Sequence, residues 1–211
     1  DAAFHGSLGE LFLLWEYATV IAGYLQGINP FDQPNVESAK VAARALLDSP
    51  ASNAEVDFVD RGVAIKSYGF DIQGSTLDSA VEELLALVDD SSYISIHAYL
   101  NRMAYPQLES LRELLAKRSG RPVTFGWAPR FLHSTGQYHK GGPKQGVFLQ
   151  LTGEHETDLA IEGRPFSFGS LIQAQAAGDA NVLKDNGLPV LTLKLGNVLA
   201  DLDKLKQVIA S

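Results

Sequence analysis

Apolar residues recur on almost every side of a helical wheel between Leu8 and Gly27, a pattern typical of a buried helix. The motif at residues 29–34 contains two prolines and ends this pattern, because proline interrupts a helix. A second helix is predicted from Asn35 to Leu47. Residues 48–60 are rich in small and acidic side chains and are predicted to form a connector.

The remainder of the chain alternates between strand-like and helix-like segments. We predict strands at 63–68, 93–100, 123–127, 147–151 and 190–195, and helices at 77–88, 107–117 and 197–209. Because such alternation is typical of crossover connections, we expect an α/β fold with a mostly parallel sheet flanked by helices and an N-terminal helical segment. The expected regions are a helical segment, 1–50, and an α/β domain, 51–211.

Composition narrows the possible partners. A net charge of −8 argues against nucleic acid, because phosphate binding needs a basic face. No uninterrupted apolar run reaches the roughly 18 residues of a membrane span. The absence of cysteine excludes disulfides and thiolate metal sites, and no histidine pair has metal-site spacing. We therefore expect a soluble cytoplasmic protein with no metal, no membrane and no nucleic acid.

In residues 128–146 the apolar positions follow neither a helical nor a strand periodicity. This stretch separates two predicted strands, as a functional loop would. This loop lies in a window, 114–153, that has six basic residues and no acidic residue. The window indicates either a local anion site or a solvated basic surface. Short polar donors in the loop favour a phosphorylated polyol as the ligand. The candidate substrate-binding residues of the loop are Arg130, Ser134, Gln137 and Lys140.

The start of the second predicted helix offers another anion site. Asp32 or Asn35 can cap this helix, and its free backbone N–H groups would face an anion beside the Gln33 side chain. Lys40 follows Glu37 by three residues, so the two can pair. An ordinary capped helix with a surface Glu–Lys pair explains the same spacing.

Two segments resemble the phosphoglucose isomerase (glucose-6-phosphate isomerase) family. Residues 27–40, GINPFDQPNVESAK, resemble the family's C-terminal signature, with Asn35 where the family usually has glycine. Residues 132–138, LHSTGQY, resemble the segment that carries its ring-opening histidine. The KGGP sequence at 140–143 and residues 167–195 are similar to the isomerases that are fused behind a transaldolase.

This resemblance implies a sugar-isomerase-like fold and interconversion of glucose 6-phosphate and fructose 6-phosphate without a cofactor. Lys40 and His133 match the catalytic lysine and the ring-opening histidine, and Gln33 matches a substrate-binding glutamine. The family's carboxylate base lies in a Glu-Ser-x-Gly-Lys-like segment that this sequence lacks. The implied partners are therefore an upstream isomerase domain, a fused transaldolase domain and a second subunit of a homodimer. We expect the isolated fragment to be inactive.

Two alternatives to an enzymatic role remain. The chain could be a non-catalytic sugar-phosphate-binding module, or a structural domain that positions the transaldolase. The histidine segment follows the lysine signature here, whereas it precedes it in the usual family order. Of the other histidines, His97 is expected in the core, whereas His139 could contact phosphate or face solvent.

Overall fold

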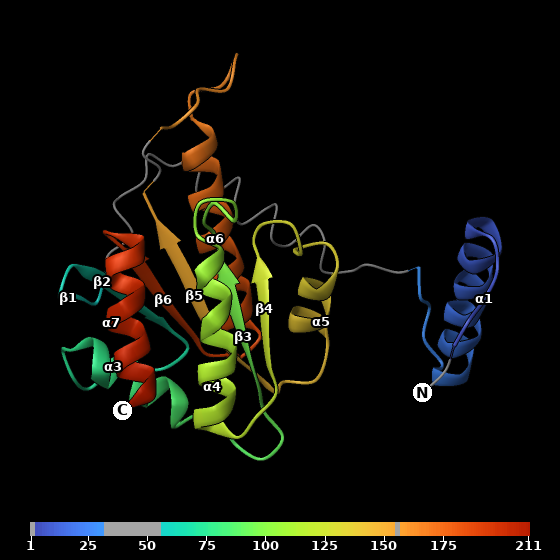
Figure 1. The fold of residues 1–211 in the computed structure, drawn as a ribbon, viewed down its shortest axis with the longest axis horizontal. Helices are drawn as coiled ribbons and strands as arrows, with labels where there is room; N and C mark the ends of the chain where they lie inside the picture. Colours follow the sequence, from blue (N-terminus) through green and yellow to red (C-terminus); the bar gives the residue numbers. More distant parts are fainter. Residues whose placement is uncertain (1–2, 32–55, 155–156) are drawn as a thin grey trace. The chain divides into compact units, whose positions relative to one another are not determined.

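The computed structural model describes residues 3–31, 56–154 and 157–211 (Figure 1). The chain forms two compact units, Asp1–Pro34 and Asn35–Ser211, and each is described by itself. The predicted second helix, 35–47, lies outside the described residues, and so does the predicted domain boundary at 50/51. Both stay predictions.

The first unit contains one long helix, α1 (Leu8–Gln26). Ser7 and Glu10 form a capping box at its start, and Gly27 ends it in the left-handed conformation. The predicted helix is confirmed. In this unit by itself Gly23 is its one buried residue, so the predicted burial of the helix stays a prediction. By length and composition alone α1 could also span a membrane, although core helices of soluble proteins meet the same criteria.

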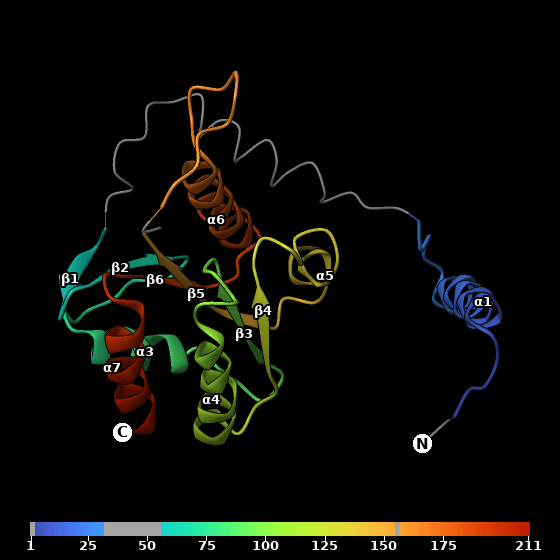
Figure 2. The same ribbon diagram turned by 45° about the horizontal axis from the view of Figure 1, so that its top comes forward.

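The second unit is built on a six-stranded sheet with the order β1-β2-β6-β5-β3-β4 (Figures 1 and 2). Strands β3 to β6 are mutually parallel, whereas β1 and β2 join the β6 edge in antiparallel fashion. The predicted mostly parallel sheet is therefore confirmed. The strands are β1 (Phe58–Asp60), β2 (Val63–Tyr68), β3 (Tyr93–Ala98), β4 (Val123–Trp127), β5 (Gly146–Gly153) and β6 (Val190–Leu195).

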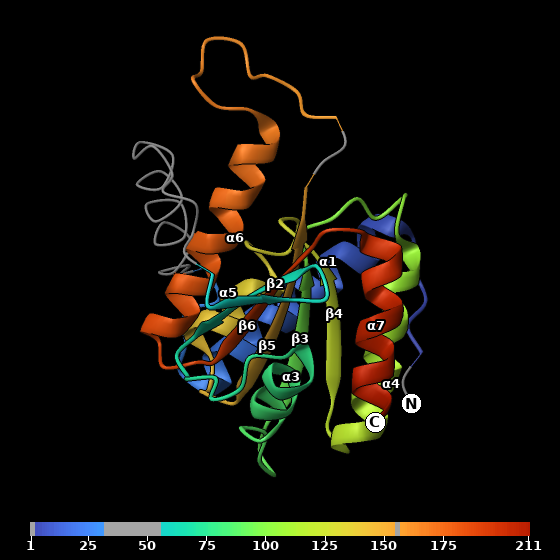
Figure 3. The same ribbon diagram turned by 90° about the vertical axis from the view of Figure 1, so that its left-hand side faces the viewer.

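Helices cover both faces of this sheet, as Figure 3 shows for α4 and α7 on one side and α6 on the other. One face carries α3 (Leu77–Leu85), α4 (Leu111–Ser119, after a short 3-10 helix, Pro106–Ser110) and α7 (Val198–Ala210). The opposite face carries α5 (Thr135–Gly141) and α6 (Phe168–Asp185). The sequence pattern did not predict β1, α5 or α6. In α6 most buried positions hold alanine or glycine, so the helix has only a weak apolar period.

Alternating strand residues give the sheet two chemically different faces. On the face under α3, α4 and α7 every inward residue of the central strands is apolar, and these residues form the main core. The opposite face of the same strands carries Ser95, His97, Gln150 and Thr192. Helices α5 and α6 therefore cover a partly polar face.

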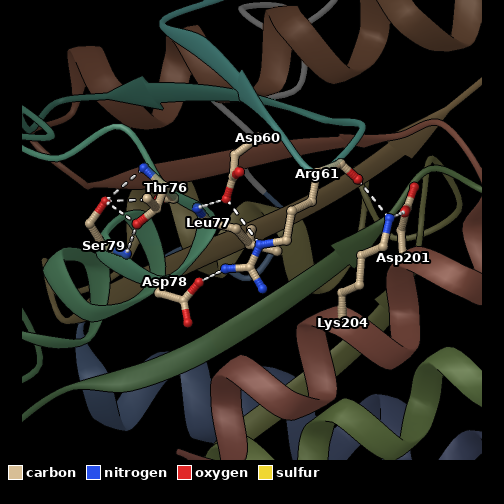
Figure 4. A network of polar contacts seen from close by, with 8 residues as sticks. All are labelled: Asp60, Arg61, Thr76, Leu77, Asp78, Ser79, Asp201 and Lys204. Carbon is tan, nitrogen blue, oxygen red and sulfur yellow. Dashed lines mark hydrogen bonds and ion pairs between the residues drawn. The ribbon is translucent and has the colours of Figure 1, made fainter.

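A polar network fixes the β1–β2 hairpin to two helices of the apolar face (Figure 4). The Asp60 carboxylate accepts a hydrogen bond of 2.8 Å from the Leu77 N–H at the start of α3. This bond holds the pKa of Asp60 below its ordinary value. The Lys204 ammonium of α7 donates to the Arg61 carbonyl at 2.6 Å and to Asp201 at 2.7 Å. The hairpin is thus a structural element, on the edge away from the predicted ligand loop.

Candidate functional site

The predicted ligand loop leaves the carboxyl end of β4, which is an outer strand of the sheet. Parallel sheets bind ligands at this end of their strands. The Phe131 carbonyl accepts hydrogen bonds of 2.9 Å from the N–H groups of Ser134 and Gly136. A Cβ atom on Gly136 would lie 2.9 Å from that carbonyl oxygen, so this tight turn requires glycine. The turn leads directly into α5.

Three of the predicted site residues face solvent on this loop. The side chains of Arg130, His133 and Ser134 belong to exposed residues, so a ligand could reach them. The Gln137 amide donates a 2.8 Å hydrogen bond to the Leu132 carbonyl, which ties the first turn of α5 to the loop. We call residues 131–137 the His133 turn.

The fifth predicted loop residue, Lys140, is placed differently from our expectation. Its ammonium is buried, with a side-chain exposure of 1%, and lies 2.7 Å from the Asp179 carboxylate of α6. A lysine in that position cannot contact a solvent-borne phosphate directly. We therefore remove Lys140 from the direct ligand contacts, because its charge is already compensated inside the protein.

Lys40 and Gln33 lie outside the described residues. Their proximity to His133 consequently stays a prediction. His133 and Ser134, by contrast, lie together in the same exposed turn, with Arg130 just before it.

Beneath the His133 turn lies a buried polar cluster on the α5/α6 face of the sheet. The His97 imidazole of β3 contacts Asp179 through Nδ1 at 3.4 Å and the Ser95 hydroxyl through Nε2 at 3.0 Å. His139 of α5 lies close by, with its Nδ1 2.8 Å from the Tyr93 hydroxyl. His97 is thus buried as expected, whereas His139 is buried instead of facing solvent.

The environment shifts the ionisation of this cluster. Burial by itself would raise the pKa of Asp179, but the His97 imidazole and the Lys140 ammonium outweigh it and hold the pKa below its ordinary value. Burial, together with the neighbouring His97, lowers the pKa of His139 to about 4. Burial also raises the pKa of the Tyr99 hydroxyl well above its ordinary value. At neutral pH the cluster therefore contains an ionised Asp179 and a neutral His139.

Ser95, His97 and Asp179 have the order of contacts found in a nucleophilic serine triad. Such a nucleophile must touch a substrate carbonyl. All three residues are at most 2% exposed, so a substrate has no access to the Ser95 oxygen. The arrangement is a buried polar network and not a hydrolase site.

Sequence reasoning missed Asp179, because α6 was not predicted. One signal was available: β3 and β5 place serine, histidine and glutamine between apolar neighbours. Among residues 3–31, 56–154 and 157–211, no group of three or more histidine or acidic side chains could hold a metal ion.

Comparison with known proteins identifies one related family over part of the chain. No protein-family model matches the chain. A glucose-6-phosphate isomerase from Leptospira interrogans is 51% identical over 49 residues, which make up 23% of this chain and 11% of that enzyme. Glucose-6-phosphate isomerases from Heliobacterium modesticaldum and Exiguobacterium sibiricum are 51% identical over 53 residues and 52% identical over 48 residues. The chain thus spans about a tenth of the length of these relatives and contains a region similar to them.

The fold comparison reaches further along the chain. A hypothetical protein from Thermus thermophilus matches 64% of this chain and 39% of its own length, with a TM-score of 0.52 and 17% identity. This likeness supports the α/β fold alone.

Proposed function

We propose that this chain is part of a glucose-6-phosphate isomerase of the transaldolase-fused type and supplies substrate-binding and ring-opening groups. The observation that carries the proposal is the identity of about half over 48 to 53 residues with three isomerases. Residues 27–40 resemble the C-terminal signature of the same family, which is a second indication of this relationship. The proposed reaction interconverts glucose 6-phosphate and fructose 6-phosphate, in the cytoplasm and without a cofactor.

In this proposal His133 and Lys40 act on the sugar ring. An imidazole can move a proton between the ring oxygen and the anomeric hydroxyl, and an ammonium can stabilise a developing alkoxide. The exposure of His133 is compatible with this role. Gln33, Arg130, Ser134 and Gln137 would hold the substrate. Lys140 would contribute indirectly, through Asp179.

The apolar surface of α1 supports an upstream isomerase domain as a partner. Large apolar side chains are exposed along the whole helix, including Phe12 at 62%, Trp15 at 54% and Ile21 at 56%. Helices that are apolar on all sides are normally buried in a larger protein or a membrane. About nine-tenths of each isomerase relative lies outside the match, which leaves ample protein to cover α1. A homodimer, with His133 reaching the partner subunit's site, belongs to the same proposal.

A non-catalytic sugar-phosphate-binding module is the second candidate. The matched stretch of 48 to 53 residues is much shorter than the α/β unit, Asn35–Ser211, so these matches leave most of this unit uncovered. Such a module needs only the donors of the His133 turn. It would bind glucose 6-phosphate without needing Lys40 near His133.

Comparing cyclic with open-chain sugar phosphate as the substrate of the longer protein distinguishes the two candidate functions. We expect His133→Ala to slow turnover of cyclic glucose 6-phosphate by about 10²-fold or more, the usual size of general acid–base catalysis. Turnover of an open-chain sugar phosphate should fall much less, because no ring has to be opened. His5→Ala, at an exposed histidine outside the His133 turn, serves as the histidine control.

Equal losses on both substrate forms would contradict a ring-opening role for His133. Unchanged turnover of both forms, with weakened binding, would favour the binding module. For the isolated 211-residue chain we expect no isomerase activity, which a coupled assay for fructose 6-phosphate formation can check.

A further inference from the structure

The buried charges between α5, α6 and β3 call for an explanation, because they are costly. The side chains of Lys140, Asp179 and His97 are each only 1–2% exposed. Taking an ammonium and a carboxylate out of water costs several kcal/mol per ion, and a well-packed apolar pair of similar volume is often equally stable. Fold stability alone therefore does not account for this pair.

The pair joins a short helix, α5, to the longer α6. Helix α5 has seven residues, and an isolated helix of that length is marginal in water. Lys140, in its last turn, is tied to Asp179 near the middle of α6. His139, beside it, stacks on Tyr93 and meets its hydroxyl. The position of α5 on the sheet is thus set by buried polar contacts.

Helix α5 and the His133 turn form one hydrogen-bonded piece. The Gln137 amide of α5 donates a hydrogen bond to the Leu132 carbonyl, and the Phe131 carbonyl accepts one from the Gly136 N–H. The Phe131 ring in turn lies 4.6 Å, centroid to centroid, from the His97 ring. A shift of α5 would consequently move the exposed His133 turn with it.

We propose that Asp179 is a positioning residue for the His133 turn. Its carboxylate binds Lys140 on one oxygen and meets His97 on the other, and so fixes α5 between α6 and β3. The other polar groups of this cluster are Tyr93, Ser95, Tyr99 and His139. The proposal rests on the proposed function only for what the turn binds; the placement of the turn itself can be measured without a ligand.

The test uses the 211-residue chain with its buried pair made apolar, Lys140→Met together with Asp179→Leu. Because both charges leave together, the fold should survive, with an unchanged far-ultraviolet circular dichroism spectrum. The NMR signals of the His133 ring, assigned with His133→Gln, should shift and broaden as the turn loses its anchor. The matched control replaces an exposed pair on the same sheet face, Lys194→Met with Glu154→Leu, and should leave these signals unchanged.

A second readout is binding of glucose 6-phosphate, followed by the same His133 signals, with inorganic phosphate as the competing anion. We expect the apolar-pair variant to bind glucose 6-phosphate at least about tenfold more weakly, equivalent to about 1.4 kcal/mol in binding free energy. Asp179→Glu, which keeps a carboxylate for Lys140, should restore part of the binding. If the apolar pair does not fold, Lys140→Gln with Asp179→Asn replaces it.

An apolar-pair variant whose His133 signals match those of the parent would overturn the positioning role. The proposed function fails in a distinguishable way. If the parent chain responds to neither glucose 6-phosphate nor phosphate, the sugar-phosphate assignment of this turn is wrong, whereas a shifted His133 signal in the variant still supports positioning by Asp179.

Discussion

The two faces of the sheet differ in what holds their helices. Under α3, α4 and α7 the buried core contacts with the sheet are between apolar side chains, such as Ile96 and Leu151. Under α5 and α6 the apolar contacts form two small clusters, and a charged network lies beside them. Apolar packing depends on fit and little on direction, whereas an ion pair fixes particular atoms against each other. The difference indicates that one face stabilises the fold and the other determines where the His133 turn lies.

Removing one buried charge should have the largest effect. Lys140→Met leaves the Asp179 carboxylate buried without its cation, at a cost of about 3–5 kcal/mol in the free energy of unfolding. Lys194→Met removes an exposed lysine whose partner Glu154 is 78% exposed, and should cost less than about 1 kcal/mol. Urea unfolding of both variants checks the difference. Similar losses in the two would show that burial gives the inner pair no special weight.

A cavity on the apolar face should have the next largest effect. Leu151 is fully buried in the main core, so Leu151→Ala should lower the free energy of unfolding by about 3 kcal/mol. The position of the His133 turn should not change, because α5 packs on the other face. A His133 NMR signal that moves as much in Leu151→Ala as in the Asp179 variants would contradict the division of labour between the faces.

Acid should weaken the polar face first. The pKa of His139 is about 4 in the folded protein and 6.5 ordinarily, so the unfolded chain takes up the proton more readily. This contribution is complete above pH 6.5 and is lost as the pH falls toward 4, by about 3 kcal/mol over the whole range. Urea unfolding at about pH 7 and about pH 5, on either side of the ordinary histidine pKa, measures it. In His139→Gln the free energy of unfolding should differ less between these two pH values. An unchanged difference would show that groups other than His139 cause the pH dependence.

Among the buried positions, the smallest effect is expected at a neutral polar residue of the α5/α6 face. The Gln150 side chain donates to the Ala176 carbonyl at 3.0 Å and accepts from the Thr192 hydroxyl at 2.9 Å. Gln150→Leu leaves the buried Ala176 carbonyl and the partly buried Thr192 hydroxyl without this partner and should cost about 1–2 kcal/mol. Adding Thr192→Val should recover part of that loss in thermal unfolding, since one unpaired group is then removed. A further loss in the double variant would contradict this reasoning.

The apolar face is the part of the fold that the sequence predicts well. Strands such as 63–68, 123–127 and 190–195 agree with the structure because strong alternation and β-branched or leucine residues mark them. Helix α6 could not be predicted from the periodicity of its apolar residues. Its packing side chains are alanine and glycine, which fit against a polar sheet face and leave little periodic signal.

The candidate site is predictable to a lesser degree. The acid-free window at 114–153 and the loop chemistry locate an exposed turn with His133 and Ser134. The same pattern places Lys140 among the ligand contacts, because a basic residue in a loop sequence usually faces water. Its burial depends on Asp179, which lies far along the chain in a helix that the pattern does not reveal. Such a partner is set by tertiary structure, not by local sequence.

The central claim is that His133 and Lys40 act on one sugar phosphate within a larger isomerase. A crystal structure of the longer protein with bound glucose 6-phosphate tests it most directly. We predict that the His133 imidazole and the Lys40 ammonium, from one subunit or from two, both lie within hydrogen-bonding distance of the ring oxygen or the anomeric hydroxyl. A bound sugar that contacts Lys40 while His133 faces open solvent far from it would contradict the account.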